Sequence, residues 1–316
     1  MGMQRIQSGP GTYYELMDSV GRGGFARVYR ARRVSGSVSE VVCLKIPIGS
    51  EGKREVQEEA RLLRAIDSDA VVRFIECVEL SDGRVALALE LIQGSSLAEL
   101  DPARTRAAPL RAGTVAYVGA RLCEALSAGN RAIAGGLVHR DVSPHNVLIS
   151  RSGAVKLTDF GVARAWDRGG WTDARCIKGK LSYASPEQLL GGPLDARSDL
   201  FALGVILFQL CTGKHPFGQG SPRDKARGIL MAAPPQAPPV DARVAQGILS
   251  LLARCPDERP PSPAHAAEVF SALTDATAAR EELADRVSRL RPGLARCRAS
   301  RQHAQTMRSL RGGAIA

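Results

Sequence analysis

The sequence has no apolar stretch long enough to cross a membrane as a helix. Such a span needs roughly 18 consecutive apolar residues, and the longest candidate, residues 200–211, is shorter and contains Gln209. Arg5 is followed by no apolar core of the kind found in secretion signals. We therefore expect neither a membrane span nor a secretion signal.

Paired cysteines are also missing. The seven cysteines are scattered along the chain, and no two of them form a C-x-x-C motif. This pattern argues against a zinc site and against a disulfide framework. Thiols that stay unpaired are typical of a reducing compartment, so we expect the protein to act in the cytoplasm.

The composition is ordinary for a globular protein, but the charge is not balanced. With 316 residues, 44% hydrophobic and 24% charged, the chain suits one large domain or two lobes with separate cores. The net charge is +11, and residues 276–316 carry nine arginines against three acidic residues. Such a basic tail can bind nucleic acid, anionic lipid or an acidic protein. The alternative is a solvated helix with a frayed end. No aromatic residues lie between its arginines to stack on bases, so nucleic acid is not expected.

Polar residues that suit phosphate chemistry gather in the run HRDVSPHN at residues 139–146. Asp141 and Asn146 lie five positions apart, and Pro144 excludes a regular helix or a central strand, so a loop is predicted there. Asp159 follows 18 residues after Asp141, and each loop borders a short apolar segment that predicts a strand. Two carboxylates and an amide in this setting suit a site that holds metal ions on a phosphate chain and orients a hydroxyl.

A glycine-rich turn, GRGGFARV at residues 21–28, lies in the first part of the chain. Its glycines allow backbone N–H groups to approach a phosphate without a Cβ clash. Taken alone the signal is weak, because a glycine-rich segment between two strands is more often only a turn.

Lys45 lies in an otherwise apolar strand predicted over residues 40–46, where a lysine needs a partner. The helix predicted over residues 55–66 offers Glu59, which precedes the apolar positions, whereas Glu55 and Glu58 are expected to face solvent. We predict an ion pair between Lys45 and Glu59; the alternative is a surface helix without one.

Periodicity divides the rest of the chain into a sheet region and a helical region. Alternation predicts strands over residues 71–75 and 84–91, so the first ninety residues form a mostly antiparallel sheet with one helix. Helical spacing predicts the later elements, over residues 115–134, 198–213, 244–253 and 263–273. A short amphipathic stripe of Leu283, Val287 and Leu290 follows.

In order and spacing, these motifs resemble the protein kinase family, most of all bacterial serine/threonine kinases of the eukaryotic-like type. The resemblance runs from about residue 13 to residue 273. It is carried by the glycine-rich turn, Lys45, Glu59, the loop at 139–146, DFG at 159–161, SPE at 185–187, SDLFALG at 198–204 and PDERP at 256–260.

The resemblance implies an α+β, two-lobed kinase fold. A small antiparallel β-sheet lobe with one helix would span residues 13–92, and a larger, mainly helical lobe would span residues 95–275. Residues 1–12 would be an N-terminal extension, and residues 276–316 a basic C-terminal tail.

It also implies ATP and Mg²⁺ (or Mn²⁺) as cofactors. Asn146 and Asp159 would hold the metal, and Asp141 would accept the proton of the substrate hydroxyl. Lys45, held by Glu59, would contact the α- and β-phosphates. The residues implied to bind the nucleotide are Val20, Gly21, Arg22, Gly23, Gly24, Phe25, Ala26, Val28, Lys45, Glu90, Ile92, Asn146, Leu148 and Asp159. As architecture, Glu187 would pair with Arg259, and Asp199 would brace the backbone of His139 and Arg140.

The chain departs from the family pattern at two positions. The residue two places after the catalytic Asp is usually Lys and is here Ser143; the later Gly-Thr turn is here Gly179-Lys180. In the family these two side chains meet beside the catalytic Asp. We hypothesise that they are exchanged, so that Lys180 supplies the ammonium group beside the γ-phosphate and Ser143 the hydroxyl that pairs with Asp141. Otherwise Lys180 is a solvated loop residue in a weaker enzyme.

The resemblance implies transfer of phosphate to protein Ser/Thr hydroxyls, with autophosphorylation. Thr172 and Ser182 are the candidate sites on the segment before Ser185, where Arg140 could bind the phosphate. Ser143 leaves open a nucleotide-binding pseudokinase scaffold, although every other site residue is present. The long segment ending in SPE argues against a small-molecule phosphotransferase, and Ser143 with the turn after that segment argues against tyrosine specificity.

Overall fold

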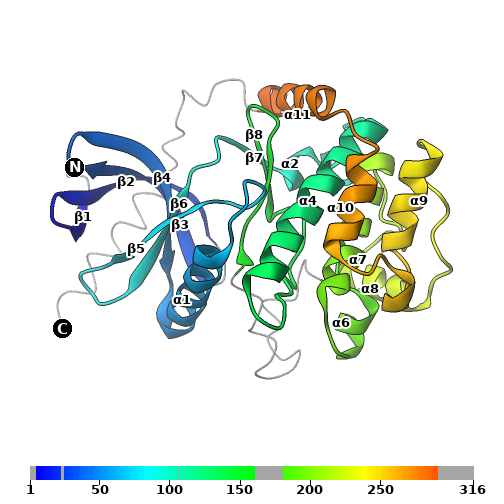
Figure 1. The fold of residues 1–316 in the computed structure, drawn as a ribbon, viewed down its shortest axis with the longest axis horizontal. Coiled ribbons are helices and arrows are strands. Elements are labelled where there is room, and N and C mark those ends of the chain that lie inside the picture. The colour runs from blue at the N-terminus through cyan, green and yellow to red at the C-terminus, as the bar shows by residue number, and fades with distance from the viewer. Residues whose placement is uncertain (1–4, 23–24, 106, 161–180, 291–316) are drawn as a thin grey trace. The chain divides into compact units, whose positions relative to one another are not determined.

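The computed structural model describes residues 5–22, 25–105, 107–160 and 181–290 (Figure 1). The chain forms two compact units, of which the first takes in Met1–Val56 and Ile75–Leu91 and the second Gln57–Phe74 and Ile92–Leu290. The first unit is built around a β-sheet and the second is mainly helical. The predicted α+β class with a sheet lobe and a helical lobe is therefore confirmed.

A six-stranded sheet, in the order β1-β2-β3-β4-β6-β5, organises the first unit. Its strands are β1 (Arg5–Gly9), β2 (Thr12–Arg22), β3 (Ala26–Ser35), β4 (Val38–Pro47), β5 (Phe74–Glu79) and β6 (Val85–Glu90). β1 pairs antiparallel with β2. The segment predicted as an N-terminal extension thus contributes an edge strand, whose short alternation the sequence pattern did not reveal.

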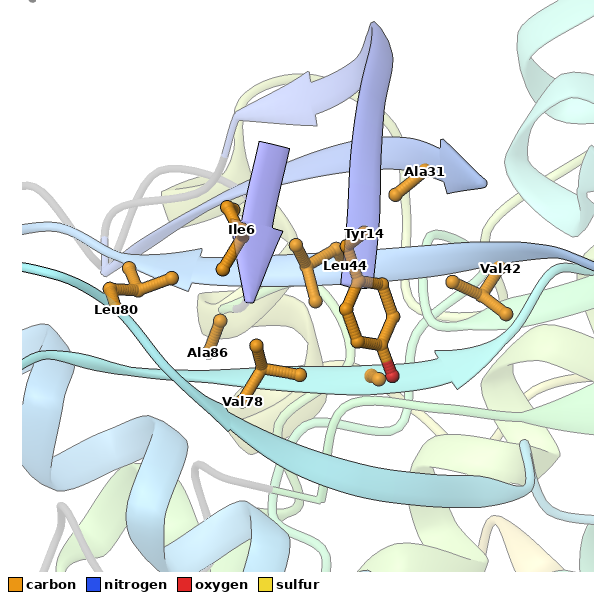
Figure 2. Packing of buried hydrophobic residues seen from close by; sticks show 9 residues of the cluster. Ile6, Tyr14, Ala31, Val42, Leu44, Val78, Leu80 and Ala86 are labelled. Atoms are coloured by element: carbon orange, nitrogen blue, oxygen red, sulfur yellow. The ribbon is translucent and has the colours of Figure 1, made fainter. Parts of the chain in front are cut away.

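The core of this unit lies on one face of the sheet, where apolar side chains from all six strands meet (Figure 2). Tyr14 is fully buried in it, and its hydroxyl donates to a carboxylate oxygen of Glu76 at 2.6 Å. Arg33 donates to the same oxygen at 2.8 Å. Burial and the neighbouring Glu76 raise the pKa of Tyr14, which stays a neutral donor. The cluster consists of Ile6, Tyr14, Ala31, Val42, Leu44, Val78, Leu80, Ala86 and Ala88.

The strand predicted over residues 71–75 is wrong in its position. Val71 forms only an isolated parallel bridge with Leu157, and Val72 donates its N–H to the Leu157 carbonyl at 3.0 Å. Both valines are buried in the second unit, so their apolar character reflects packing there rather than membership of the large sheet.

Helices supply most of the second unit, together with a three-stranded sheet of β7 (Gly94–Ser96), β8 (Val147–Ser150) and β9 (Val155–Leu157). The most buried helix is α7, which packs against α4. The helices are α2 (Leu97–Leu100), α3 (Pro102–Thr105), α4 (Ala112–Ala132), α6 (Pro186–Leu190), α7 (Ala196–Thr212), α8 (Pro222–Met231), α9 (Ala242–Leu251), α10 (Pro263–Ser271) and α11 (Ala276–Leu290).

Two helices differ from the sequence prediction. α1 (Gly49–Ala65) begins six residues before the predicted start at residue 55. Its first turns contain Gly49 and Gly52, which are poor helix formers and hide the start. α8 was not predicted, although Ser221 and Asp224 form a capping box at its N-terminus that signals a helix.

The amphipathic stripe beyond the predicted lobe belongs to α11, which packs against α4, β8 and α2 (Figure 1). Leu283 and Val287 of this stripe are buried, whereas Leu290 at the helix end is 45% exposed. A carboxylate oxygen of Glu282 on α11 accepts from Thr114 Oγ1 at 2.6 Å and from Arg111 Nε at 2.9 Å on the α4 side. α11 is thus an integral part of the second unit.

In the described part of the chain, no helix combines the length and the apolarity that crossing a bilayer requires. The cysteines described there, at positions 43, 77, 123, 211 and 255, form no disulfide bonds. Burial raises the pKa of Cys123, and it raises that of Cys211 to about 12, so these two thiols are not reactive nucleophiles.

We predict that Leu283→Ala lowers the free energy of unfolding by about 2–5 kcal/mol, because Leu283 is fully buried and its loss leaves a cavity under α11. Leu290→Ala is the matched control on the same helix and should change it by less than about 0.5 kcal/mol. Urea unfolding of both variants measures the difference. Equal free energies of unfolding for the two variants would contradict the packing of α11 in the second unit.

Candidate active site

The two predicted site loops are brought together by the pairing of β8 with β9. Val147 opens β8 and is the register partner of Leu157, which closes β9. Asn146, just before β8, accepts the N–H of Thr158 on its carbonyl at 3.0 Å. The Thr158 carbonyl in turn accepts from His139 Nε2 at 3.1 Å. The backbone of Thr158, the residue before Asp159, is therefore held through both its N–H and its carbonyl by the loop of residues 139–146.

Asp141 and Asn146 form a buried pair within this loop, each 8% exposed. Asn146 Nδ2 donates to the Asp141 carbonyl at 2.9 Å and to the Asp141 carboxylate at 3.0 Å. Both amide hydrogens are thereby used, and the amide oxygen is the atom of Asn146 left to bind a cation. The partly buried Asp159 supplies a carboxylate on the adjoining loop.

This donor set fits Mg²⁺ held against a phosphate chain. Among the described residues, no group of three or more His, Cys, Asp or Glu side chains is arranged to hold a metal ion. Mg²⁺ in phosphate-transfer sites is usually held by one or two carboxylates, with phosphate oxygens and water completing the octahedron. One carboxylate from Asp159 and one amide oxygen from Asn146 match that pattern.

The loop adopts a backbone conformation that its residues do not favour. Arg140 has φ of 64° and Asp159 has φ of 70°, both in the left-handed region. Each such residue costs on the order of 1–3 kcal/mol and persists only where its surroundings fix it. Nothing in the sequence pattern indicates this strain at Arg140.

Asp199 holds the backbone of the loop at His139 and Arg140, as predicted. Its two carboxylate oxygens accept the N–H groups of His139 at 2.6 Å and of Arg140 at 2.8 Å, so the predicted brace is confirmed. Asp199 is 3% exposed, and burial raises its pKa to about 6 although the two N–H groups oppose that shift.

Phe160 anchors the second loop in the core. It is 1% exposed and meets the His139 ring edge to face, with centroids 4.6 Å apart. A Cβ on Gly129 of α4 would lie only 3.0 Å from the Phe160 ring, so a glycine lets the ring approach the helix. Sequence reasoning missed both Thr158 and Gly129, which carry no motif of their own.

Lys45 lies in the first unit, on β4 between β3 and β6. Its register partners are Val28 on β3 and Leu87 on β6, so the three side chains project from the same face of the sheet. Leu44 and Val42 point to the opposite face, into the core. Lys45 and Val28 therefore share the face away from that core.

The glycine-rich turn joins β2 to β3, where Gly21 pairs with Val28. The Phe25 carbonyl accepts the N–H of Ile48 at 2.7 Å. A Cβ on Gly52 would lie 2.1 Å from that carbonyl, so only glycine fits at the start of α1. Val20 on β2 is 56% exposed. Gly23 and Gly24 lie outside the described residues.

Glu59 is 1% exposed on α1, whereas Glu58 pairs with Arg61 at 2.9 Å on the outer side of the helix. Glu59 belongs to the second unit and Lys45 to the first, so their ion pair stays a prediction. The same holds for the nucleotide contacts of Glu90, at the end of β6, and of Ile92, which begins the second unit.

The remaining predicted residues are distributed as follows. Leu148 is partly buried on β8, opposite Ser96 of β7. Ser143 is 8% exposed, and its carbonyl accepts the N–H of Asn146 at 3.0 Å. Ser182 is 5% exposed, and its carbonyl accepts from His215 Nε2 at 2.7 Å. Lys180 and Thr172 lie outside the described residues.

The predicted ion pair between Glu187 and Arg259 is confirmed. The Arg259 side chain is fully buried and donates to both carboxylate oxygens of Glu187, at 2.7 and 2.8 Å. Burial alone would raise the pKa of Glu187, but hydrogen bonds from Arg259 and Ser198 outweigh it and lower the pKa to about 2. On the same short helix, Gln188 donates to the Arg140 carbonyl at 3.3 Å, which ties α6 to the site loop.

Comparison with known proteins agrees with this geometry. The family described as protein kinase domain matches residues 14–271. The serine/threonine-protein kinase pkn3 of Myxococcus xanthus is 32% identical over 276 residues, which cover 82% of this chain and 49% of that protein. The serine/threonine-protein kinase PknL of Mycobacterium tuberculosis is 35% identical over a region that covers 86% of this chain and 66% of that protein. The serine/threonine-protein kinase PrkC of Bacillus subtilis is 30% identical over a region that covers 78% of this chain and 38% of that protein. The chain thus spans about half of the pkn3 protein and less of PrkC.

We predict that Glu187→Gln lowers the free energy of unfolding by about 3–5 kcal/mol at neutral pH, because it leaves the buried Arg259 charge unpaired. The folded-state pKa of Glu187, about 2, lies below its ordinary value of 4.5. The ion pair's contribution is therefore complete above pH 4.5 and is lost as the pH falls toward 2. The variant should lose less stability than the wild-type protein over that window.

Urea unfolding at neutral pH and at several acidic pH values measures both effects. Asp257→Asn is the control, because Asp257 is 84% exposed and pairs with Arg197 on the surface, where a change within about 0.5 kcal/mol is expected. Parallel pH profiles for Glu187→Gln and the wild-type protein would contradict the role of the pair.

Proposed function

Since the chain belongs to the protein kinase family, we propose that it transfers the γ-phosphate of ATP to Ser and Thr hydroxyls of proteins and of itself. The observation that carries this proposal is the pair of hydrogen bonds on Thr158, the residue before Asp159: its N–H is bonded to the Asn146 carbonyl and its carbonyl to the His139 ring. It supports a site in which a carboxylate and an amide oxygen face a metal-bound phosphate while Asp141 remains available to a hydroxyl.

In this proposal Asp141 accepts the proton of the acceptor hydroxyl and aligns that oxygen for attack. Asn146 fixes the Asp141 carboxylate through its 3.0 Å hydrogen bond, so the base keeps one orientation. Asp159 and Asn146 would hold Mg²⁺ (or Mn²⁺), which neutralises phosphate charge and lets a nucleophile approach.

Residues of the first unit would bind the nucleotide. Lys45 would contact the α- and β-phosphates while Glu59 holds its ammonium group, and the turn at residues 20–28 would cover the phosphates. The shared face of Lys45 and Val28 supports this assignment, because it puts an ammonium group next to an apolar contact for the base. The backbone of Glu90 and Ile92 would pair with the adenine edge.

The short helix α6 supports a protein rather than a small molecule as the substrate. Arg259 and the Arg140 carbonyl fix α6 beside the site loop, and the segment before it ends in Ser185. Such a platform suits an extended peptide.

The buried Ser182 is a poor phosphate acceptor in this conformation, so Thr172 is the preferred autophosphorylation site. We further infer a cytoplasmic location from the unpaired cysteines, and an acidic partner for the basic tail.

We predict that Asp141→Asn abolishes autophosphorylation, with a loss of at least about 10²-fold, because an amide cannot accept the proton. The assay uses the full chain with Mg²⁺ and labelled ATP, and Asp257→Asn is the matched acid-to-amide control on the surface. A wild-type protein that incorporates no label would favour a nucleotide-binding scaffold. Label on tyrosine alone would overturn the Ser/Thr assignment.

The exchange of Ser143 and Lys180 remains part of this proposal. The burial of Ser143 beside Asn146 supports it, because a buried hydroxyl there can reach the Asp141 region but not solvent. Lys180 would then bring the ammonium group that the family places two residues after the catalytic Asp.

We predict that Lys180→Ala lowers kcat on the order of 10²-fold, as loss of one charge-stabilising donor does. The double variant Lys180→Thr/Ser143→Lys restores the family arrangement and should recover most of that loss. Steady-state kinetics with a peptide substrate measures both. If Lys180→Ala leaves kcat unchanged, the exchange hypothesis is wrong.

A further inference from the structure

A basic pair lies beside the site loop at a place that the proposed phosphate transfer does not use. Arg104 on α3 contacts His145, with Nη1 and Nε2 only 2.6 Å apart. Arginine has donors and no acceptor, so Nε2 of His145 accepts and its ring is neutral. Both residues are exposed. His145 immediately precedes Asn146, which contacts the Asp141 carboxylate.

The carboxylates near this pair are engaged elsewhere. Asp101 is 1% exposed and accepts the N–H of Ala103 at 2.9 Å, and burial raises its pKa. Glu99 accepts the N–H of Ser96 at 3.2 Å at the start of α2. Within the described ranges, no carboxylate forms an ion pair with Arg104. Arg104 is thus an exposed cation outside any described ion pair, and its charge acts on the carboxylate of Asp101, which is buried.

The geometry also orients the guanidinium group. One of its N–H groups is fixed on His145, and the others form the planar fork that binds a carboxylate or a phosphate with two hydrogen bonds. A group that is already held in position loses less freedom when it binds a ligand. His145 thus prepares Arg104 to receive an anionic side chain.

The position of Arg104 and His145 suits contact with a substrate residue close to the acceptor Ser or Thr. The acceptor hydroxyl would lie at Asp141, and His145 is four residues further along the same loop. An extended peptide advances about 3.3–3.6 Å per residue. A substrate side chain a few residues from the acceptor therefore spans the stretch of loop between Asp141 and His145.

We propose that Arg104 is a specificity-determining residue that binds an acidic side chain, Asp or Glu, a few residues from the acceptor Ser or Thr. His145 is its positioning residue. This inference rests on the proposed protein kinase activity and adds to it a class of preferred substrate, namely acidic segments. It also gives a role to an exposed arginine beside the loop that the reaction itself leaves unused.

The test uses the full chain and peptides with one acceptor, in which Glu, Gln or Lys is placed in turn at each position near that acceptor. For the wild-type enzyme, Glu should lower KM about tenfold relative to Gln at one position, because a charge-assisted bidentate contact is worth roughly one decade of affinity. The effect should fall on KM and not on kcat, since the contact is the same in ground and transition states.

Reversing the charge gives the sharpest readout. Arg104→Glu should lose the preference for Glu at that position and favour Lys there, and its melting temperature should match that of the wild-type protein. Arg243→Glu is the matched control, because Arg243 on α9 is 76% exposed and lies outside the site. His145→Ala should weaken the preference, and His145→Gln, which keeps an acceptor, should preserve it.

Each outcome separates this inference from the proposed function. Phosphorylation of all peptides with equal KM, or an unchanged Glu preference in Arg104→Glu, would overturn the inference and leave the kinase activity standing. A wild-type protein that labels neither itself nor any peptide would overturn both. Phosphoserine in place of Glu should bind comparably; labelling of phosphoserine peptides alone would assign Arg104 to previously phosphorylated substrates instead.

Discussion

The antiparallel pairing of β8 with β9 is the constraint on which the site depends. Because Val147 and Leu157 are register partners, the residues just outside them must lie side by side. That is why Asn146 and Thr158 are bonded to each other through their backbones. The Thr158 carbonyl also accepts a hydrogen bond from the His139 ring, so the residue before Asp159 is held against the loop of residues 139–146.

A second constraint keeps the loop in a conformation that it would not adopt by itself. Arg140 and Asp159 both have left-handed backbones, which together cost on the order of 2–6 kcal/mol. The buried Asp199 offsets part of that cost through two hydrogen bonds to the loop backbone. Asp199 in turn lies on α7, the most buried helix, so the core of the second unit fixes the loop. In the proposed function, the chemistry would therefore depend on a carboxylate that touches no reacting atom.

Much of the site could be predicted from the sequence, because its parts are motifs at fixed spacing. The brace from Asp199 and the pair of Glu187 with Arg259 were implied by the resemblance to the protein kinase family, and the structure contains both. The hydrogen bond from Asn146 to Asp141 was not predicted, although the spacing put both residues on one loop. The backbone strain at Arg140 could not be predicted, since strain arises from tertiary contacts.

The errors in the fold have similar causes. β1 is too short to show a convincing alternation, and the glycines at the start of α1 hide a helix that packing stabilises. Val71 is apolar because it packs in the second unit, and the sequence alone could not distinguish that from strand pairing. Arg104 carries no motif, and its place beside His145 depends on how α3 folds back onto the loop.

In the proposed function, an acidic substrate must approach the carboxylates of Asp141 and Asp159, and the charges around the loop explain how it would do so. Exposed charges interact over a screening length of roughly 8 Å at physiological ionic strength, so a direct ion pair outweighs repulsion from carboxylates further away. The carboxylates of the loop are also buried or bonded: Asp141 is 8% exposed and bonded to Asn146. Arg104, by contrast, is exposed and already oriented by His145. An acidic side chain would therefore meet the exposed guanidinium group before it experiences the buried carboxylates, and this order of contact favours acidic segments as substrates.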